Sequence, residues 1–325
     1  MQTIFLAAAS LWCVLAVIWL VALGDAKARW MHWTHALLPI AAVGLYPWLP
    51  AGSVPAQAVA QWLAAGAAVW VFLTLVWLLS IAIRNASIMD VVYTPSVSIT
   101  LVVLLFSDGN YSARQLALAF IVIAWSARLV WHASDTNLTR GEQEPYARWR
   151  VRYAGRWWWR SYFQVFLLQG ALIWIWMLSL ALALAAGPGP LTPTDLAGVA
   201  LWALGFVFQA GADWQLKRFK AIPENKGKVM RAGFWSLTRH PNYFGETAMW
   251  WGYFLFGLAH PYGWLGIASA LYVTWFMSKG SAAPMLERHM LKTKPDYAQY
   301  VASVPAFFPR ILRRKATVRN DEAGS

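Results

Sequence analysis

The sequence predicts an all-α protein that crosses a membrane about nine times, and three observations lead to this fold class. Of its 325 residues, 59% are hydrophobic and 13% are charged, with a mean hydropathy of +0.45, whereas soluble domains carry about 25% charged residues. Apolar runs long enough to cross a bilayer as a helix, about 17 to 25 residues, recur along the chain. The basic residues gather between these runs. A polytopic helical membrane protein is therefore the expected class.

The predicted spans follow one another with short connections. They cover residues 3–23, 34–50, 57–82, 88–106, 112–133, 162–187, 194–212, 241–259 and 262–278. The first run has no basic segment before it and is followed by Lys27 and Arg29, which favours a retained span over a signal peptide. The second is short and contains Pro39 and Pro47, so a re-entrant or interfacial segment is the alternative there.

The distribution of basic residues supports this number of spans. Alternating nine spans places 24–33, 83–87, 134–161, 213–240 and 279–325 on one side of the membrane. That side receives 26 of the 27 Lys and Arg residues, counting Arg128, and the other side receives only Arg114. The positive-inside rule then predicts an N-terminus outside and a C-terminus in the cytoplasm. We expect a multi-pass protein of the cell (inner) membrane with its site towards the cytoplasm.

The chain divides into three expected regions. Residues 1–56 would form extra N-terminal transmembrane helices, and 57–309 the main transmembrane domain. Residues 310–325 are polar and lack periodicity, which predicts a disordered basic tail able to rest on anionic headgroups. The net charge of +13 follows from the basic loops, so nucleic-acid binding is not expected.

The segment richest in chemistry runs from 213 to 246 and reads DWQLKRFKAIPENKGKVMRAGFWSLTRHPNYFGE. Its basic residues are Lys217, Arg218, Lys220, Lys226, Lys228, Arg231 and Arg239. Lysine and arginine bind phosphates, and the helix N-terminus after Pro241 favours an anion. Asn242 offers both a donor and an acceptor, which suits a carboxamide. The segment predicts a site for a phosphate-rich cofactor; a solvated basic loop is the alternative.

Asp90 lies near the inner end of the fourth predicted span. A carboxylate at membrane depth must face protein, water or a partner. Tyr93 is one turn away on the same helix face. Asp90 is expected either to pair with Arg84 or Arg128, or to contact a substrate that enters from the bilayer.

The loop 134–161 combines six arginines with acidic and aromatic residues. One interpretation is a positive-inside loop with an aromatic belt at 157–159; the other gives Arg140, Glu144 and Tyr146 a function. No GxGxxG, Walker or GxSxG motif occurs. His32 and His35 lack further ligands at metal-site spacing, so no metal site is expected.

Two motifs, DWQLKRFK (213–220) and GFWSLTRHPNYFGE (233–246), resemble the bacterial membrane family grouped with the steroid 5-alpha-reductase C-terminal domain (3-oxo-5-alpha-steroid 4-dehydrogenase-like, of the domain of unknown function 1295 type). The resemblance covers most of 84–309 and includes FQVFLLQG, PENKGKVM and LERHMLKTKPDYAQYVASVPAFFP. The looser pattern RHPxY is shared with membrane methyltransferases such as isoprenylcysteine carboxyl methyltransferase, which use S-adenosylmethionine.

The resemblance implies seven spans that enclose NADPH from the cytoplasmic side, with the first two spans as an addition. The residue chemistry and the resemblance together give the candidate cofactor residues Arg128, Arg140, Asp213, Lys217, Lys220, Lys228, Arg239, His240, Asn242, Tyr243, Glu287 and His289. Steroid reductases polarise the substrate ketone with a glutamate–tyrosine pair. Here Asp90 takes the glutamate position and Trp125 the tyrosine position, so Tyr93 would have to substitute. Asp90, Tyr93 and Glu246 are the expected catalytic residues.

The expected function is NADPH-dependent reduction of a C=C bond in a lipophilic substrate, steroid-, isoprenoid- or lipid-like, taken from the bilayer. Membrane lipids are the other expected partners, and no obligate protein partner is evident. The alternatives are an S-adenosylmethionine-dependent membrane methyltransferase and a non-enzymatic lipid-binding membrane protein. NADPH carries three phosphates that would engage the basic residues of 217–231, whereas S-adenosylmethionine carries none.

Overall fold

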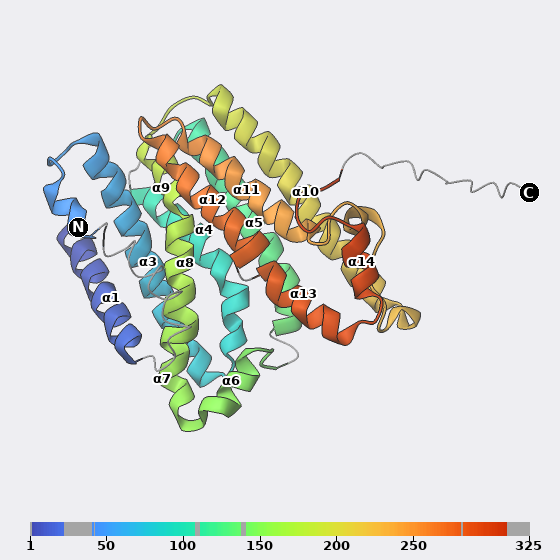
Figure 1. Cartoon of the computed structure of the whole chain (residues 1–325). Coiled ribbons are helices and arrows are strands. Elements are labelled where there is room, and N and C mark those ends of the chain that lie inside the picture. The colour runs from blue at the N-terminus through green and yellow to red at the C-terminus, as the bar shows by residue number, and fades with distance from the viewer. Residues whose placement is uncertain are drawn as a thin grey trace, which may run out of the picture. The chain divides into compact units, whose positions relative to one another are not determined.

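The computed structural model describes residues 2–22, 41, 43–107, 111–137, 141–280 and 282–310. Every regular element in these ranges is helical and none is a strand (Figure 1), which confirms the all-α class. Residues 311–325 of the predicted tail, and both His32 and His35, lie outside the described residues.

The helices follow the predicted apolar runs in part. Their bounds are α1 Gln2–Ala22, α3 Val54–Ala82, α4 Met89–Ser107, α5 Ala113–Asn137, α6 Tyr146–Tyr153, α7 Trp157–Ser161, α8 Leu168–Trp176, α9 Leu178–Ala185, α10 Pro193–Ala221, α11 Pro241–Gly257, α12 Ile267–Trp275, α13 Ala282–Thr293 and α14 Tyr297–Ser303. Two π-helical segments, Tyr162–Leu167 and Phe276–Gly280, interrupt the α-helical pattern. The run predicted as one span over 162–187 is therefore divided into a π segment, α8 and α9.

Several of these helices are long and apolar enough to cross a membrane. Within the described residues they are Val54–Ala82, Ala86–Leu105, Ala113–Ser134 and Pro193–Ala221, and a fifth candidate joins Tyr146–Trp176 to Leu178–Ala185 with a bend of 46°. These helices support a multi-pass membrane protein. The number of nine spans and the orientation of the chain stay predictions.

Contacts divide the chain into a first unit, Met1–Ala203 with Ala248–Thr274, and a second unit, Leu204–Thr247 with Trp275–Ser325. In the first unit, α3 packs against α1, α8 and α9, and α4 packs along α5 (Figure 1). In the second unit, α13 packs against α14.

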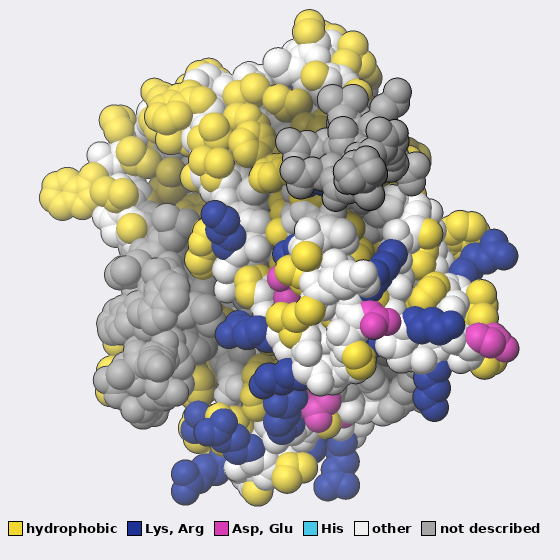
Figure 2. All heavy atoms as spheres, turned by 45° about the vertical axis from the view of Figure 1, so that its right-hand side comes forward, with side chains coloured by type: hydrophobic (Ala, Val, Ile, Leu, Met, Phe, Trp, Pro, Cys, Tyr) yellow, Lys and Arg dark blue, Asp and Glu magenta, His cyan; other side chains and the backbone are white. Residues whose placement is uncertain are grey.

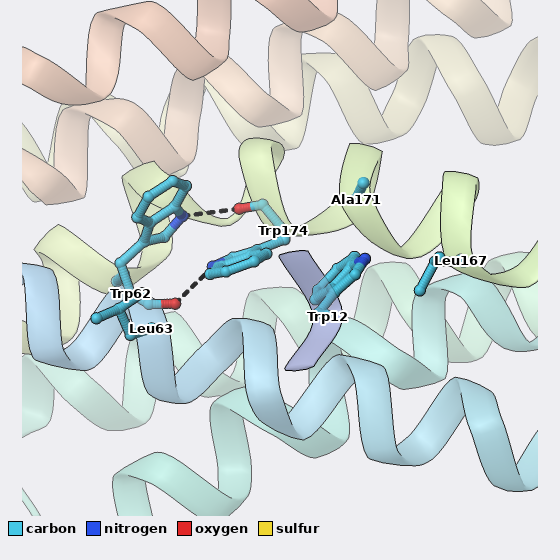
Figure 3. Packing of buried hydrophobic residues seen from close by; sticks show 7 residues of the cluster. Trp12, Trp62, Leu63, Leu167, Ala171 and Trp174 are labelled. Carbon is cyan, nitrogen blue, oxygen red and sulfur yellow. Dashed lines mark hydrogen bonds between the residues drawn. The ribbon is translucent and has the colours of Figure 1, made fainter. Parts of the chain in front are cut away.

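Paired tryptophans join α3 to α8 in the core of the first unit. The indole nitrogen of Trp62 donates to the backbone oxygen of Trp174 at 2.8 Å, and that of Trp174 donates to the backbone oxygen of Trp62 at 2.7 Å (Figure 3). Trp12 of α1 stacks on Trp174 with ring centroids 4.7 Å apart. A Cβ at Gly66 would lie 2.0 Å from the Trp174 ring, so the glycine makes room for this packing.

A buried ion pair joins other helices of the first unit. The guanidinium of Arg114, on α5, lies 3.0 Å from the Asp195 carboxylate, on α10, and both side chains are buried. Arg114 also donates to the backbone oxygens of Ala183 and Phe256, at the ends of α9 and α11. The only basic residue assigned to the outer side by the charge pattern is thus an internal link between four helices.

Helices α10 and α11 approach each other through glycines. In the first unit, a Cβ at Gly252 would lie 2.7 Å from the backbone oxygen of Gly198. In the second unit, a Cβ at Gly245 would lie 2.4 Å from the backbone oxygen of Gly205. Small residues of this kind allow two helices to come into backbone contact. The polar side chains that follow on both helices consequently face one another in the second unit.

Candidate functional site

A buried polar cluster lies between α10 and α11 in the second unit. Gln209 and Asp213 are four residues apart on α10, and Asn242 and Glu246 are four residues apart on α11, so each pair shares one helix face. The amide nitrogen of Asn242 donates to Asp213 Oδ1 at 3.0 Å, and that of Gln209 donates to Glu246 Oε2. Three predicted residues therefore come together. Gln209 was missed by the sequence analysis, although it is a polar residue in an apolar run one turn before Asp213.

The residues just before α11 are bound to the C-terminal helices. Arg239 Nε donates to Glu287 Oε1 at 2.8 Å, and His240 Nε2 lies 2.9 Å from the same oxygen. Arg239 Nη1 also donates to the backbone oxygens of Val301 and Val304, both at 2.9 Å. The structure thus gives Arg239 and Glu287, both predicted cofactor ligands, a second role: they hold α13 and the end of α14 against the start of α11.

The electrostatics of the contact between His240 and Glu287 favour a neutral histidine. Burial lowers the pKa of His240, and Arg239 adds to this, while the hydrogen bond and charge of Glu287 only partly offset it. For Glu287, partial burial alone would raise the pKa, but hydrogen bonds and charge from Arg239 and His240 lower it below its ordinary value. Because the carboxylate accepts from Nε2, Nδ1 of a neutral His240 is an acceptor. This buried Nδ1 has no partner among the described residues.

Tyr243 completes this end of the cluster. Its ring stacks on that of His240, with centroids 5.4 Å apart and planes 6° from parallel. Asn242 Oδ1 accepts from the backbone N–H of Tyr243 at 3.1 Å. His289, by contrast, has an exposed side chain on α13.

Basic side chains of the second unit are exposed to solvent. Lys217 and Lys220 lie on the last turns of α10, and Lys228 follows a turn in which Gly227 has φ of +86°. One face of the molecule exposes separate groups of Lys and Arg side chains together with wide hydrophobic patches (Figure 2). The exposed ammonium groups of Lys220 and Lys228 can bind phosphates in solution without being removed from a structural contact.

The first unit holds a second polar cluster. The hydroxyl of Tyr146, at the start of α6, donates to Asp90 Oδ1, in the first turn of α4, at 2.6 Å. Gln169 Nε2, on α8, donates to the Tyr146 hydroxyl at 3.3 Å. Tyr146 is only 5% exposed. Asp90 therefore has a tyrosine partner from a distant segment, which the residues near Asp90 in the sequence do not reveal.

Tyr93, the expected substitute, has another environment. Its ring lies edge-on to Trp125 with centroids 6.2 Å apart. Trp125 in turn contacts Trp250 and Tyr253 edge-on, in a buried aromatic cluster of the first unit. The geometry assigns the Asp90 hydrogen bond to Tyr146 and gives Tyr93 a packing contact.

A network around Glu142 positions α6 beside α4. One carboxylate oxygen of Glu142 accepts from the backbone N–H of Ala86 at 2.7 Å, and Arg150 Nε donates to the other at 2.5 Å. The backbone N–H of Gln143 donates to Ser87 Oγ at 3.1 Å. These contacts fix the segment that precedes Tyr146 at the start of α4. Arg140, a predicted cofactor residue, lies outside the described residues. Arg128, another one, is half-buried on α5.

Comparison with known proteins identifies the family and a distant relative. The sequence family described as "Protein of unknown function (DUF1295)" matches residues 76–304, and this family is linked to steroid 5-alpha-reductase-like proteins. The "Probable O-methyltransferase ustE" of Ustilaginoidea virens is 35% identical over 97 residues, which cover 29% of this chain and 32% of that protein. The chain thus matches about a third of that relative's length. No solved structure gives a significant match.

Proposed function

The chain belongs to the DUF1295 family, and on that premise we propose that it is an integral membrane enzyme that reduces a C=C bond of a lipophilic substrate with NADPH. The substrate class is a steroid-, isoprenoid- or lipid-like compound whose C=C bond is conjugated to a carbonyl. The apolar helices support a membrane protein that takes such a substrate from the bilayer. We further propose that the cell membrane holds the protein with its site towards the cytoplasm.

The hydrogen bond between Tyr146 and Asp90 is the observation that carries this proposal. It supplies, at 2.6 Å, the carboxyl–tyrosine pair that the reductase resemblance requires and that the sequence alone did not provide. A phenol that donates to a substrate carbonyl stabilises the negative charge that develops on its oxygen during reduction. Gln169 donates to the phenol oxygen, and the Tyr146 proton is directed to Asp90. When Asp90 is in its acid form, its carboxyl donates to the phenol oxygen instead, and the Tyr146 proton is available to a substrate carbonyl.

The protons of the reaction can be assigned to this pair. NADPH, when bound, supplies a hydride to the β carbon of the conjugated C=C bond. The displaced electron pair collects on the substrate carbonyl oxygen, and Tyr146 passes its hydroxyl proton to that oxygen. Asp90 in its acid form returns a proton to Tyr146, and solvent restores Asp90. The enol then becomes the saturated ketone, so that one hydride and one proton are added overall.

The second-unit residues fit NADPH. The His240 Nδ1 atom is a buried acceptor without a partner among the described residues, which suits an amide or hydroxyl donor of a ligand. Asn242 and Asp213 offer a donor–acceptor pair, and they would hold the carboxamide or ribose. The exposed ammonium groups of Lys220 and Lys228 would hold phosphates.

A membrane O-methyltransferase is the second candidate, because the relative from Ustilaginoidea virens bears that name. A methyltransferase that uses S-adenosylmethionine would bind a ligand without phosphates, so the lysines would contribute little to affinity. It would also have no need of the carboxyl–tyrosine pair in the first unit.

Ligand binding to the purified protein separates the candidates. NADPH, NADH and S-adenosylmethionine are titrated in parallel by tryptophan fluorescence or calorimetry, with wild type and Asn242→Ala. The proposal expects tight binding of NADPH, weaker binding of NADH because it lacks the 2′-phosphate, and loss of NADPH affinity in the variant. Binding of S-adenosylmethionine without NADPH would establish the methyltransferase instead.

A further inference from the structure

The first unit contains a cavity at the end of α3 that the proposed reaction does not use. Its volume is about 240 Å³, and it lies between the last turn of α3 and the segment from α6 to α7. The lining includes Ser80, Arg84, Arg150, Ala154, Trp157 and Ser161. Drug-sized ligands occupy pockets of about 300 to 1,000 Å³, so this cavity suits a headgroup rather than a whole lipid.

The charges and donors of the wall select an anion. Arg150 is neutralised by Glu142, whose carboxylate it contacts at 2.5 and 2.9 Å. The guanidinium of Arg84 has no partner among the described residues and is exposed. The wall therefore has an excess positive charge, which a phosphate would neutralise.

The backbone of the wall is strained. In the described ranges, Arg84 (φ 54°) and Ala154 (φ 42°) are the non-glycine residues with positive φ, and both line this cavity. Arg84 follows the C-cap of α3, where the N–H of Asn85 donates to Ser80 at 3.0 Å and that of Arg84 to Ile81 at 3.2 Å. Glycine is the usual residue at this position, because a side chain there is sterically disfavoured. Strain of this kind marks ligand sites more often than ordinary loops.

The cavity also lies where lipid headgroups are expected. Helix α3 is a candidate span that ends at Ala82, so the cavity begins at its last turn. Trp157 and Trp158 line the other side, and tryptophans of this kind concentrate at the level of the headgroups. Basic pockets beside transmembrane helices are suited to phosphate-bearing headgroups. We propose that this cavity binds the phosphate of an anionic phospholipid, held by Arg84.

Native mass spectrometry in detergent tests this site. The full chain is mixed with phosphatidylglycerol, phosphatidylcholine or glycerol 3-phosphate, and the retained ligand is measured. We expect wild type to retain phosphatidylglycerol in preference to the other two. Arg84→Gly keeps the backbone conformation and removes the charge, and it should weaken this binding about tenfold. Arg84→Lys should restore part of the affinity.

The matched control is Arg156→Gly, which removes an equal charge from an exposed position between α6 and α7, outside the cavity lining. It should leave phosphatidylglycerol binding unchanged. Equal losses in Arg84→Gly and Arg156→Gly would overturn the site in favour of a general charge effect. Equal retention of phosphatidylcholine and phosphatidylglycerol would overturn the anionic headgroup. Equal binding of glycerol 3-phosphate would replace the lipid with a free phosphate ester.

Discussion

Tyr146 donates a hydrogen bond of 2.6 Å to Asp90, and so connects the start of α6 to the first turn of α4. Gln169 of α8 donates to the same phenol. Three segments that are separate in the sequence thus converge on one hydroxyl group. If the first unit polarises a substrate carbonyl, this hydroxyl is the group that does so.

We predict that Tyr146→Phe lowers the reduction rate by at least about 100-fold, in the range of a lost general acid. NADPH affinity should stay unchanged, because the assigned cofactor residues belong to other helices. The measurement is NADPH oxidation with a panel of lipophilic enones, together with NADPH titration. Since the variant leaves Asp90 without this donor, it should also lose about 1 to 3 kcal/mol of stability, which thermal unfolding would detect.

Tyr93→Phe is the matched control for Tyr146→Phe. It keeps the ring that lies edge-on to Trp125 and removes only the hydroxyl. We expect its turnover to stay within about threefold of wild type, because the ring contact with Trp125 is kept and the proposed proton transfers do not involve Tyr93. Loss of turnover in Tyr93→Phe with normal turnover in Tyr146→Phe would restore Tyr93 to the role expected from the sequence.

Local composition was enough to predict the helical class and the long apolar helices. The apolar runs 57–82, 88–106 and 112–133 agree with α3, α4 and α5 to within a few residues. The polar residues at the start of α11 were singled out because charged and amide side chains stand together just before an apolar run. Helix positions and local polarity depend on residues that are close in the sequence, so they can be read from one sequence.

Contacts between distant segments could not be predicted in the same way. Tyr146 and Asp90 are 56 residues apart, and Arg114 and Asp195 are 81 apart. Nothing in the local pattern pairs them, since a functional role for Tyr146 in the loop 134–161 does not identify its partner in a distant helix. The π-helical start of the run 162–187 was also missed, because hydropathy does not distinguish a π-helix from an α-helix.

A second prediction concerns the bond between Asn242 and Asp213. If both residues bind the cofactor as one unit, Asn242→Ala and Asp213→Ala should each raise the NADPH dissociation constant at least about tenfold. The double variant should be little worse than either single one, because the two changes remove the same hydrogen-bonded pair. NADPH titrations of wild type, the two single variants and the double variant measure this coupling. Independent, additive losses would show that the pair does not act as a unit.

The lysines give a sharper test of phosphate binding than Arg239 does. Arg239 holds Glu287 and the Val301 carbonyl, so Arg239→Ala should destabilise the second unit whatever the ligand. Lys220 and Lys228 are exposed, and such substitutions change stability by about 0.5 kcal/mol or less.

We therefore predict that Lys220→Gln and Lys228→Gln weaken NADPH binding about three- to tenfold with an unchanged melting temperature. The effect should shrink as ionic strength rises, because salt screens exposed charges. Titrations at low and high salt measure it. Glu224→Gln provides a matched control, as an exposed charged residue of the same segment with the opposite sign. Equal affinity in wild type and both lysine variants would argue against a phosphate-bearing ligand.

The last prediction follows from the pKa of His240, which burial lowers and which Glu287 and Arg239 modify. The unfolded chain takes up the histidine proton near its ordinary pKa of about 6.5, before the native protein does. The lowered pKa of His240 therefore adds its full contribution to the free energy of unfolding above that pH. This contribution is lost as the pH falls towards the native pKa, by at most about 1.4 kcal/mol per pH unit. The lowered pKa of Glu287 acts in a separate window, since its contribution is complete above its ordinary value of 4.5.

Thermal unfolding from pH 7.5 to 5 checks this for wild type and His240→Gln. The glutamine retains an N–H donor for Glu287 but takes up no proton, so the variant lacks this one source of pH dependence. Wild type should lose melting temperature more steeply than the variant below pH 6.5, and the two curves should run parallel above it. Parallel curves throughout would mean that the pKa of His240 is not shifted by folding. A relative gain by wild type in acid would mean that the ion pair with Glu287 outweighs burial and raises the pKa of His240.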